Sequence, residues 1–381
     1  MVTLADRENE LRPIRANIRA VTPGGFQLET RLALVRATHL NTYISVLRDM
    51  GAPIDRELAQ SRLPKYIEET PDLYVSLPIA MEWVARTGRD LPAMELGLIG
   101  AQAASLSSLP PTQQAAIMTA QTGLKRLEAL SALSRYEDSA LEMSIRQEAD
   151  EVRVTCNMRG MERHPHVCFA EWLNLQAIIS VMRSVVGPTW YPSELCFTST
   201  NRLPDAVHVA FPDTRILVGQ AFASIVVERA CLALSTSVLA TNAQATHRPA
   251  PQTPGPVPLD SDQIGQSEDW EFVTLLRKMV QPYLADRSTN VAFIAEMAGI
   301  SKRTLQRRLK LCGSSYSGLL QEARFELARQ NLENPTLKVI DVAMMAGYES
   351  PQHFTRAFRR FTGITPTDYR NQNFVMGSAA I

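Results

Sequence analysis

Five basic side chains lie within nine positions of residues 299–310, GISKRTLQRRLK. Such a density of positive charge suits a polyanion such as nucleic acid, although most charge clusters are solvated helix faces. The spacing separates the two interpretations, because four cationic or amide residues recur at i, i+3, i+4 and i+7: Arg303, Gln306, Arg307 and Lys310. Leu305 and Leu309 share the opposite side. The stretch therefore predicts a helix with one cationic face and one buried face.

A tight turn is expected directly before this helix. Ala295, Gly299 and Leu305 are spaced by four and ten positions. A helix-turn-helix needs a small residue where its helices cross, a glycine for the left-handed turn and an apolar anchor on the second helix. Ser301 is placed to cap that second helix. These residues predict a helix-turn-helix over about 290–311.

The same pattern returns about 48 residues later. Ala343 and Gly347 repeat the spacing of four, and Phe354 with Phe358 repeats the buried pair, although the anchor falls at eleven positions instead of ten. Ser350 and Pro351 supply a cap and a first-turn proline. The expected outward residues are Gln352, Thr355, Arg356 and Arg359. A second helix-turn-helix is therefore predicted over about 339–361, with amphipathic helices at 270–286 and 318–334.

Two such units joined by one long helix and closed by GITPTDYR (363–370) resemble the DNA-binding domain of the AraC/XylS transcription regulators. The resemblance covers about 270–372 and follows the pattern D-[IV]-A…G-[FY]-x-S…F-x-R-x-F…G-x-T-P-x-x-[YF]-R nearly throughout. The departures are His353-Phe354, where many members have Tyr-Phe, and Pro351 after the capping serine.

The N-terminal region is similar to a narrower group. LRDMGAPIDRELAQSRLPKYIEETPDLYVSL (47–77) and the LG-x-x-G at 96–100 resemble the arabinose-binding-like domain of the ornithine-utilisation type of regulator. Such domains generally bind a small effector and promote dimerisation. The resemblance implies the same roles here.

By resemblance, each recognition helix enters the major groove, and the two grooves are about one helical turn apart. The residues then expected at base edges are Arg303, Gln306, Arg307, Gln352, Thr355 and Arg356. Those expected at phosphates are Lys302, Lys310, Arg359 and Arg360. Arg308 should point away from DNA, and Tyr369 with Arg370 should lock the last turn.

The chain divides at a stretch rich in proline. Residues 242–269 contain five prolines together with Gly, Ser and Gln, which is typical of an interdomain linker. We therefore expect an α+β effector-binding or dimerisation domain over 1–241, a Pro-rich linker over 242–269, an all-α DNA-binding domain over 270–372 and a tail over 373–381. The formal charge is +6 over 270–381 and −6 over 1–269, which indicates different partners for the two parts.

Periodicity gives the expected elements of the N-terminal domain. Helical spacing predicts helices within 30–51, 79–88, 112–130 and 167–187, the last ended by Gly187-Pro188. Alternation predicts a β-hairpin over 139–158, and short strands are expected near 193–199 and 215–219. The apolar stretch 221–240 is interrupted by Glu228 and Arg229, so a buried helix or strand is predicted instead of a membrane span.

Cysteine and histidine usage argues against catalytic and metal sites. The five cysteines include no C-x-x-C pair, which disfavours disulfides and thiolate zinc and fits a reducing cytoplasm. His164 and His166 flank Pro165, a pattern more typical of a loop than of a metal site. Cys168 raises an alkyl-transfer enzyme as a rival, but the Pro-Cys-His-Arg motif and four-cysteine zinc site of such enzymes do not occur. We expect no enzyme activity, no cofactor and no metal.

The sequence thus predicts a cytoplasmic, dimeric, sequence-specific transcription regulator. Its expected partners are double-stranded promoter DNA, a small-molecule effector, a second copy of the chain and, for an activator, RNA polymerase; no membrane partner is expected. The alternative is a ligand-independent regulator controlled by a protein partner, whose N-terminal domain serves only dimerisation. Three tryptophans are weak candidates for an effector pocket, although such residues are usually core: Trp83, Trp172 and Trp190.

Overall fold

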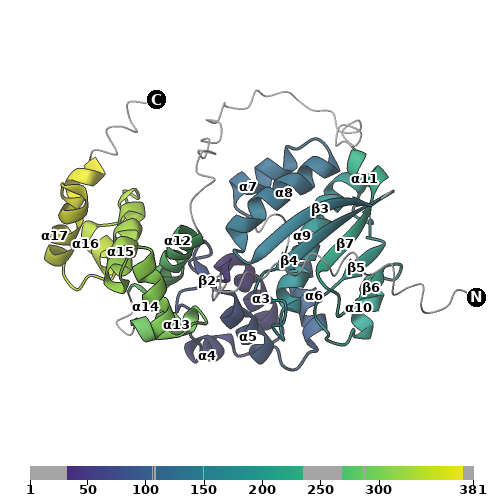
Figure 1. Ribbon diagram of the computed structural model, residues 1–381, viewed down its shortest axis with the longest axis horizontal. Coiled ribbons are helices and arrows are strands. Elements are labelled where there is room, and N and C mark those ends of the chain that lie inside the picture. Colours follow the sequence, from purple (N-terminus) through teal and green to yellow (C-terminus); the bar gives the residue numbers. More distant parts are fainter. Residues whose placement is uncertain are drawn as a thin grey trace, which may run out of the picture. The chain divides into compact units, whose positions relative to one another are not determined.

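The computed structural model describes residues 32–234, apart from 105, 107, 108 and 149, and residues 268–371, apart from 286–288 (Figure 1). The tail expected over 373–381, and the expected linker apart from its last two residues, lie outside the described residues. The described part combines strands and helices before residue 234 and consists of helices after residue 268. The predicted fold class, an α+β region followed by an all-α region with two helix-turn-helix units, is confirmed.

A five-stranded sheet forms one layer of the N-terminal region. Its order is β3-β4-β7-β5-β6, with β5 and β6 parallel and the other neighbours antiparallel. The bounds are β3 Leu141–Glu148, β4 Glu151–Met158, β5 Glu194–Cys196, β6 Arg215–Leu217 and β7 Ala223–Glu228. The predicted hairpin is confirmed, because Glu148 lies opposite Glu151 and the alternate residues Val152, Val154 and Cys156 are buried.

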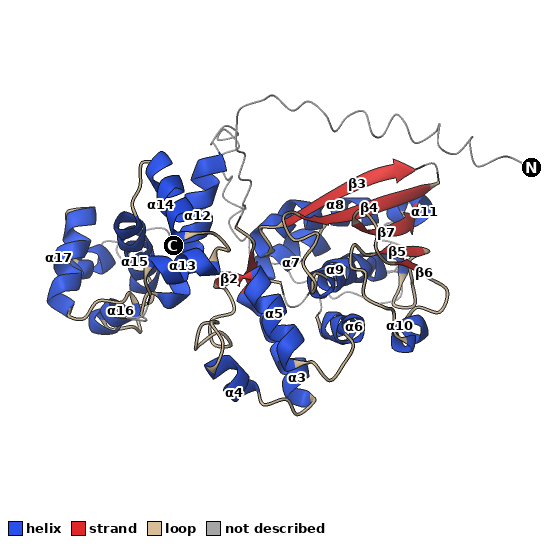
Figure 2. Ribbon diagram, turned by 60° about the horizontal axis from the view of Figure 1, so that its bottom comes forward, coloured by secondary structure: helices blue, strands red, loops and turns tan. Residues whose placement is uncertain are grey.

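Helix α9 is the centre of the N-terminal core. It contacts β4 and β7 of the sheet and also α6 and α8 (Figure 2). Because it is enclosed in this way, its sequence is apolar on nearly every face, and it ends at Gly187, whose φ is 128°. The helices of this region are α3 Ala37–Asp49, α4 Ile54–Ala59, α5 Leu77–Thr87, α6 Ala93–Ala103, α7 Pro111–Met118, α8 Gly123–Glu137, α9 Cys168–Val186, α10 Asp205–Ala210 and α11 Arg229–Ala233.

Two predicted helices differ from the structure. The stretch 30–51 begins with strand β1, Leu34–Arg36, which pairs with β2, Tyr74–Ser76, and α3 starts only at Ala37. A strand of three residues is too short to show alternation, and its partner strand lies about 40 residues away. The sequence therefore gives no signal for either strand. The stretch 112–130 breaks into α7 and α8, because the hydroxyl of Thr122 accepts a hydrogen bond from the backbone nitrogen of Lys125 at 3.3 Å and starts a new helix.

The C-terminal helices form two small cores that share one long helix. The bounds are α12 Glu268–Val280, η6 Gln281–Tyr283, α13 Val291–Met297, α14 Lys302–Leu311, α15 Tyr316–Leu332, α16 Val339–Met345 and α17 Pro351–Thr362. Leu319 and Ala323, near the start of α15, pack with α12, α13 and α14. Ala328 and Leu332, near its end, pack with α16 and α17. Each helix-turn-helix therefore has its own core, and α15 connects them.

The β1–β2 ladder contributes to two cores. Val35 belongs to the core of the N-terminal region, whereas Leu32 and Leu34 belong to the core of α12, α13 and α14. The hydroxyl of Ser76 donates a hydrogen bond to the carbonyl oxygen of Met297, the last residue of α13, at 2.9 Å. Because neighbouring residues of a strand point to opposite faces, one short ladder contacts both regions.

None of the described helices is long and apolar enough to span a bilayer.

Candidate nucleic-acid interface

The first helix-turn-helix has the predicted caps and turn. The side-chain oxygen of Asn290 accepts hydrogen bonds from two backbone nitrogens at the start of α13, at 2.9 and 3.1 Å. The hydroxyl of Ser301 accepts one from Thr304 at 3.1 Å at the start of α14. Gly299 has φ of 66°, the left-handed conformation that the turn requires. Leu305 and Leu309 are buried as predicted, which fixes the orientation of α14.

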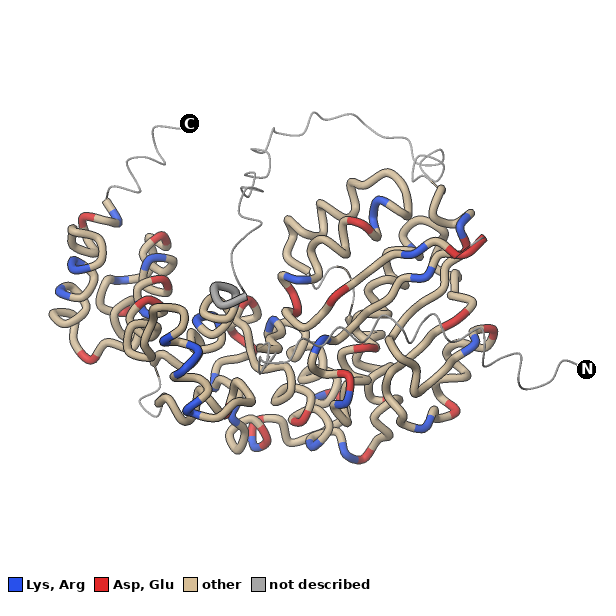
Figure 3. Tube along the Cα trace, viewed as in Figure 1, with Lys and Arg blue, Asp and Glu red and all other residues tan. Residues whose placement is uncertain are grey.

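The outer face of α14 is cationic. The exposed side chains are those expected to meet DNA: Lys302, Arg303, Gln306, Arg307 and Lys310. None of these cations forms an ion pair with a residue that the structure describes, so their charge is not neutralised within this part of the chain. Arg308 instead lies with its guanidinium carbon 3.8 Å from the ring centre of Phe272, away from the outer face. Figure 3 shows the basic positions along α14.

The second unit repeats this arrangement with an aromatic core. Gly347 has φ of 76°, and the hydroxyl of Ser350 accepts a hydrogen bond from the backbone nitrogen of His353 at 3.3 Å. Phe354 and Phe358 are buried with ring centres 5.6 Å apart. Four outward residues of α17 are exposed: Gln352, Arg356, Arg359 and Arg360.

Thr355 differs from the other residues expected at base edges. It is half-buried, and its hydroxyl donates a hydrogen bond to the carbonyl oxygen of Pro351 at 2.9 Å. A base contact by this hydroxyl would have to compete with that bond, since the hydroxyl has one hydrogen to donate.

The end of the chain's described part has a structural role. The ring of Tyr369 lies 5.5 Å from that of Phe358, and Nε of Arg370 donates a hydrogen bond to the carbonyl oxygen of Leu332 at 3.2 Å. These contacts hold the last turn against α15 and α17.

The three tryptophans proposed for an effector pocket lie elsewhere. Trp83 and Trp172 are buried in the core, where Trp172 contacts the rings of Phe197 and Phe211. Trp190 is half-buried. None of the three lines the cavity described next, and their contact with a ligand stays a prediction.

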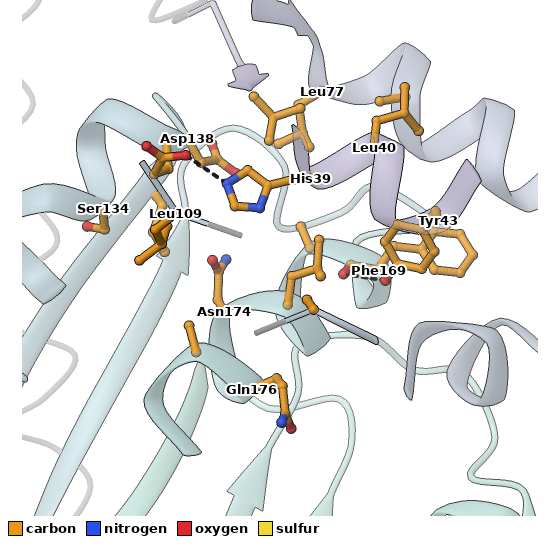
Figure 4. Close-up of a pocket in the computed structure, with 18 of the residues that line it drawn as sticks. His39, Leu40, Tyr43, Leu77, Leu109, Ser134, Asp138, Phe169, Asn174 and Gln176 are labelled. Atoms are coloured by element: carbon orange, nitrogen blue, oxygen red, sulfur yellow. Dashed lines mark hydrogen bonds and ion pairs between the residues drawn. The ribbon is translucent and has the colours of Figure 1, made fainter. Parts of the chain in front are cut away.

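A cavity of about 100 Å³ lies among α3, α5, α8, α9 and β3. Its walls are mostly apolar, with polar side chains from α3, α8 and α9 (Figure 4). Sequence reasoning missed it, because its polar residues come from three segments far apart in the chain, α3, the end of α8 and α9: His39, Ser134, Glu137, Asp138, Asn174, Gln176 and Ser180.

Two carboxyl groups with different environments line this cavity. Burial raises the pKa of Glu137, but the hydrogen bond and charge of His39, together with Arg36 and Gln113, outweigh it and hold the pKa below its usual value. Asp138 is fully buried, and burial raises its pKa to about 6 despite a hydrogen bond from the backbone nitrogen of Ala140 at 2.8 Å. The cavity therefore has an acidic end.

The geometry of the described residues does not support a nucleophilic Cys168 or a metal site at His164 and His166. Cys168 is buried, and burial raises the pKa of its thiol to about 12, which suppresses the nucleophilic thiolate. The ring nitrogen Nδ1 of His164 accepts a hydrogen bond from the backbone of His166. Among the described residues no three metal-ligating side chains come together.

Two protein-family models match the chain. The Helix-turn-helix domain model matches residues 294–372, and the model of the Arabinose-binding domain of AraC transcription regulator, N-term, matches residues 51–236. The chain belongs to the AraC family of transcription regulators. Within this AraC-type chain, the first model includes both candidate recognition helices and the second includes most of the cavity lining.

Named relatives agree with the assignment to the AraC family. The chain is 31% identical over 45% of its length to 46% of "Transcriptional activator NphR" from Rhodococcus, and 39% identical over 18% of its length to 21% of "Ornithine utilization regulator" from Pseudomonas aeruginosa. It is 24% identical over 91% of its length to 98% of "HTH-type transcriptional regulator VirS" from Mycobacterium tuberculosis. The chain thus spans less than half the length of the first two relatives.

Proposed function

We propose that this AraC-type chain is a sequence-specific DNA-binding transcription regulator controlled by a small molecule. In this proposal residues 1–241 bind the effector and dimerise, residues 270–372 bind promoter DNA, and the protein works in the cytoplasm and is not an enzyme. One observation carries the proposal: α14 and α17 each present an exposed cationic face opposite a buried apolar pair.

In this proposal α14 and α17 are recognition helices that insert into the major groove. Arginine pairs bidentately with guanine and glutamine with adenine, so Arg303, Gln306 and Arg307 of α14 read one groove. Gln352 and Arg356 of α17 read the next. Each such pair contributes about 1–3 kcal/mol of discrimination between bases. Four other basic residues contact phosphates and so position the protein without reading the base sequence: Lys302, Lys310, Arg359 and Arg360.

The cavity favours control by a ligand over the ligand-independent alternative. Most of its lining residues lie in the stretch matched by the arabinose-binding model, and it combines apolar walls with a few polar groups, which is typical of small-molecule sites. The name of the Rhodococcus relative describes an activator. We further propose that this chain activates transcription with RNA polymerase as a partner and that it forms a homodimer.

The test compares Arg307→Ala and Arg356→Ala in the full chain with Arg163→Ala, a control that removes an exposed arginine from the N-terminal region. DNA selected by the wild type from randomised duplexes serves as the ligand in fluorescence anisotropy. Each recognition-helix variant should weaken binding about 5- to 150-fold, which corresponds to 1–3 kcal/mol, with an unchanged circular dichroism spectrum and melting temperature. Wild-type affinity in both variants would reject the assignment of these residues.

A further inference from the structure

The size of the cavity limits its occupant. Its volume is about 100 Å³, whereas an engineered apolar cavity of about 150 Å³ accepts benzene. A ligand whose apolar part has about four to six carbon atoms therefore fits the cavity. Apolar side chains form most of the wall, so the part of a ligand that they enclose is apolar; the larger ones include Leu40, Leu77, Met81, Leu109, Leu141 and Phe169.

His39 lines the acidic end of the cavity with its ring. Its Nε2 lies 3.0 Å from Oε2 of Glu137, whose other oxygen accepts a hydrogen bond from Gln113 at 2.8 Å. In the neutral ring, Nε2 donates its hydrogen to the carboxylate, and Nδ1 then carries a lone pair. Nδ1 makes no hydrogen bond with a residue that the structure describes. Figure 4 shows the ring of His39 and the amide of Asn174 on facing sides of the same space.

Asn174 adds a second acceptor. Its Nδ2 donates one of its two hydrogens to the sulfur of Met158 at 3.3 Å, so Oδ1 can accept a hydrogen bond from a ligand and the second hydrogen can be donated to one. Asp138 supplies a third acceptor at the same acidic end. No lysine or arginine is among the described residues that line the cavity. The polar end thus offers acceptors and two carboxyl groups, without a lysine or arginine side chain.

We propose that the effector is a small apolar molecule with one hydrogen-bond-donating head group, an alcohol or a primary amine, which binds at the acidic end of the cavity beside His39 and Asn174. A carboxylate of the same size would meet two carboxyl groups and no lysine or arginine, so it should bind more weakly. This inference rests on the proposed function for its regulatory consequence, whereas binding of the ligand can be measured without DNA.

The β1–β2 ladder carries the effect of the ligand to the first helix-turn-helix. Val35 and Leu77 line the cavity. Their neighbours Leu34 and Ser76 contact the other region, Leu34 in its core and Ser76 through the hydrogen bond to Met297. Filling the cavity therefore acts on the residues that hold the end of α13, which is separated from α14 by residues 298–301.

The experiment titrates pentan-1-ol, pentylamine and sodium pentanoate into the full chain by isothermal calorimetry at pH 7.5. The alcohol and the amine should bind saturably with one site per chain, and pentanoate should bind at least tenfold more weakly. Equal or tighter binding of pentanoate, or the absence of saturable binding by both donors, would overturn the proposal.

Asn174→Leu tests the acceptor directly, with Asn157→Leu as a matched change of another half-buried asparagine, one outside the cavity lining. The first variant should bind pentan-1-ol at least fivefold more weakly than the wild type, and the second should match the wild type. Wild-type affinity in Asn174→Leu would overturn the role of this residue.

DNA binding measured with and without pentan-1-ol distinguishes a failure of this inference from a failure of the proposed function. Saturating pentan-1-ol should change the affinity for selected DNA at least threefold. An unchanged affinity would overturn the coupling through the ladder. Binding of pentan-1-ol by a chain that shows no preference among DNA sequences would reject the proposed function and leave the ligand site standing.

Discussion

The turn of the second helix-turn-helix gives a sharp test of the geometry that orients α17. Gly347 has φ of 76°, and a Cβ atom placed on it would lie 2.8 Å from the carbonyl carbon of Leu284 and closer still to its oxygen. Gly299, the equivalent residue of the first unit, has φ of 66° and nothing within 4 Å of the same position. Gly347→Ala and Gly299→Ala therefore introduce the same backbone strain, and only the first adds a collision with backbone.

The magnitudes follow from these two contributions. Left-handed backbone costs an alanine about 1–2 kcal/mol, which applies to both variants. Overpacking against backbone that must move adds about 1–3 kcal/mol for Gly347→Ala. One kcal/mol shifts the melting temperature of a domain of this size by about 4–8 °C, so Gly347→Ala should melt about 4–24 °C below Gly299→Ala.

Differential scanning calorimetry of the full chain measures this difference, and anisotropy with selected DNA reports its functional effect. Gly347→Ala should also bind DNA more weakly than Gly299→Ala, because the displaced turn leads directly into α17. Equal melting temperatures for the two variants would refute the close approach of Leu284 to the second turn.

Three further predictions concern charge and burial. Lys302→Ala should lower the slope of log affinity against log salt by about 0.9, measured by anisotropy from 50 to 200 mM salt; an unchanged slope would remove Lys302 from the phosphate contacts. Because burial raises the pKa of Asp138 from 3.8 to about 6, the folded state binds its proton more tightly, and stability should fall by about 3 kcal/mol as pH rises from about 4 to about 6 and then stay level. Urea denaturation should show this fall in the wild type but not in Asp138→Asn, and parallel pH profiles for the two proteins would contradict it. Arg126 is buried and donates hydrogen bonds to the carbonyl oxygens of Met118, Ala120 and Ser184 at 3.0, 3.0 and 3.1 Å, so Arg126→Met should lower the free energy of unfolding by about 2–4 kcal/mol in the same assay. A loss below 1 kcal/mol would mean that water replaces these bonds.

The helix-turn-helix units were predictable because their signals are local. Ser301, Gly299 and the pair Leu305 and Leu309 lie within ten residues, and a cap, a left-handed turn and a helical period each depend on near neighbours in the chain. The duplication around Gly347 then repeats the same physical requirements, so the same local signals indicated the second unit. The hairpin over 139–158 was predictable for the same reason.

The ladder and the cavity were not predictable, because they depend on residues far apart in the chain. Strand β1 has three residues and pairs with β2 about 40 positions later, so neither shows alternation. His39 and Glu137 are separated by 98 positions, and a lone histidine on an amphipathic helix gives no signal of its partner. Thr355 matches the outward period of α17, but its hydroxyl bonds to the carbonyl of Pro351, an interaction that periodicity does not reveal.

The central claim is that α14 and α17 read two neighbouring major grooves, and selection from randomised duplexes tests it most directly. The full chain, Arg307→Ala and Arg356→Ala are each used to select and sequence bound DNA at 150 mM salt. The account predicts a wild-type site with two conserved blocks about one helical turn apart, one block relaxed by Arg307→Ala and the other by Arg356→Ala. A single block, or the same site selected by all three proteins, would contradict it.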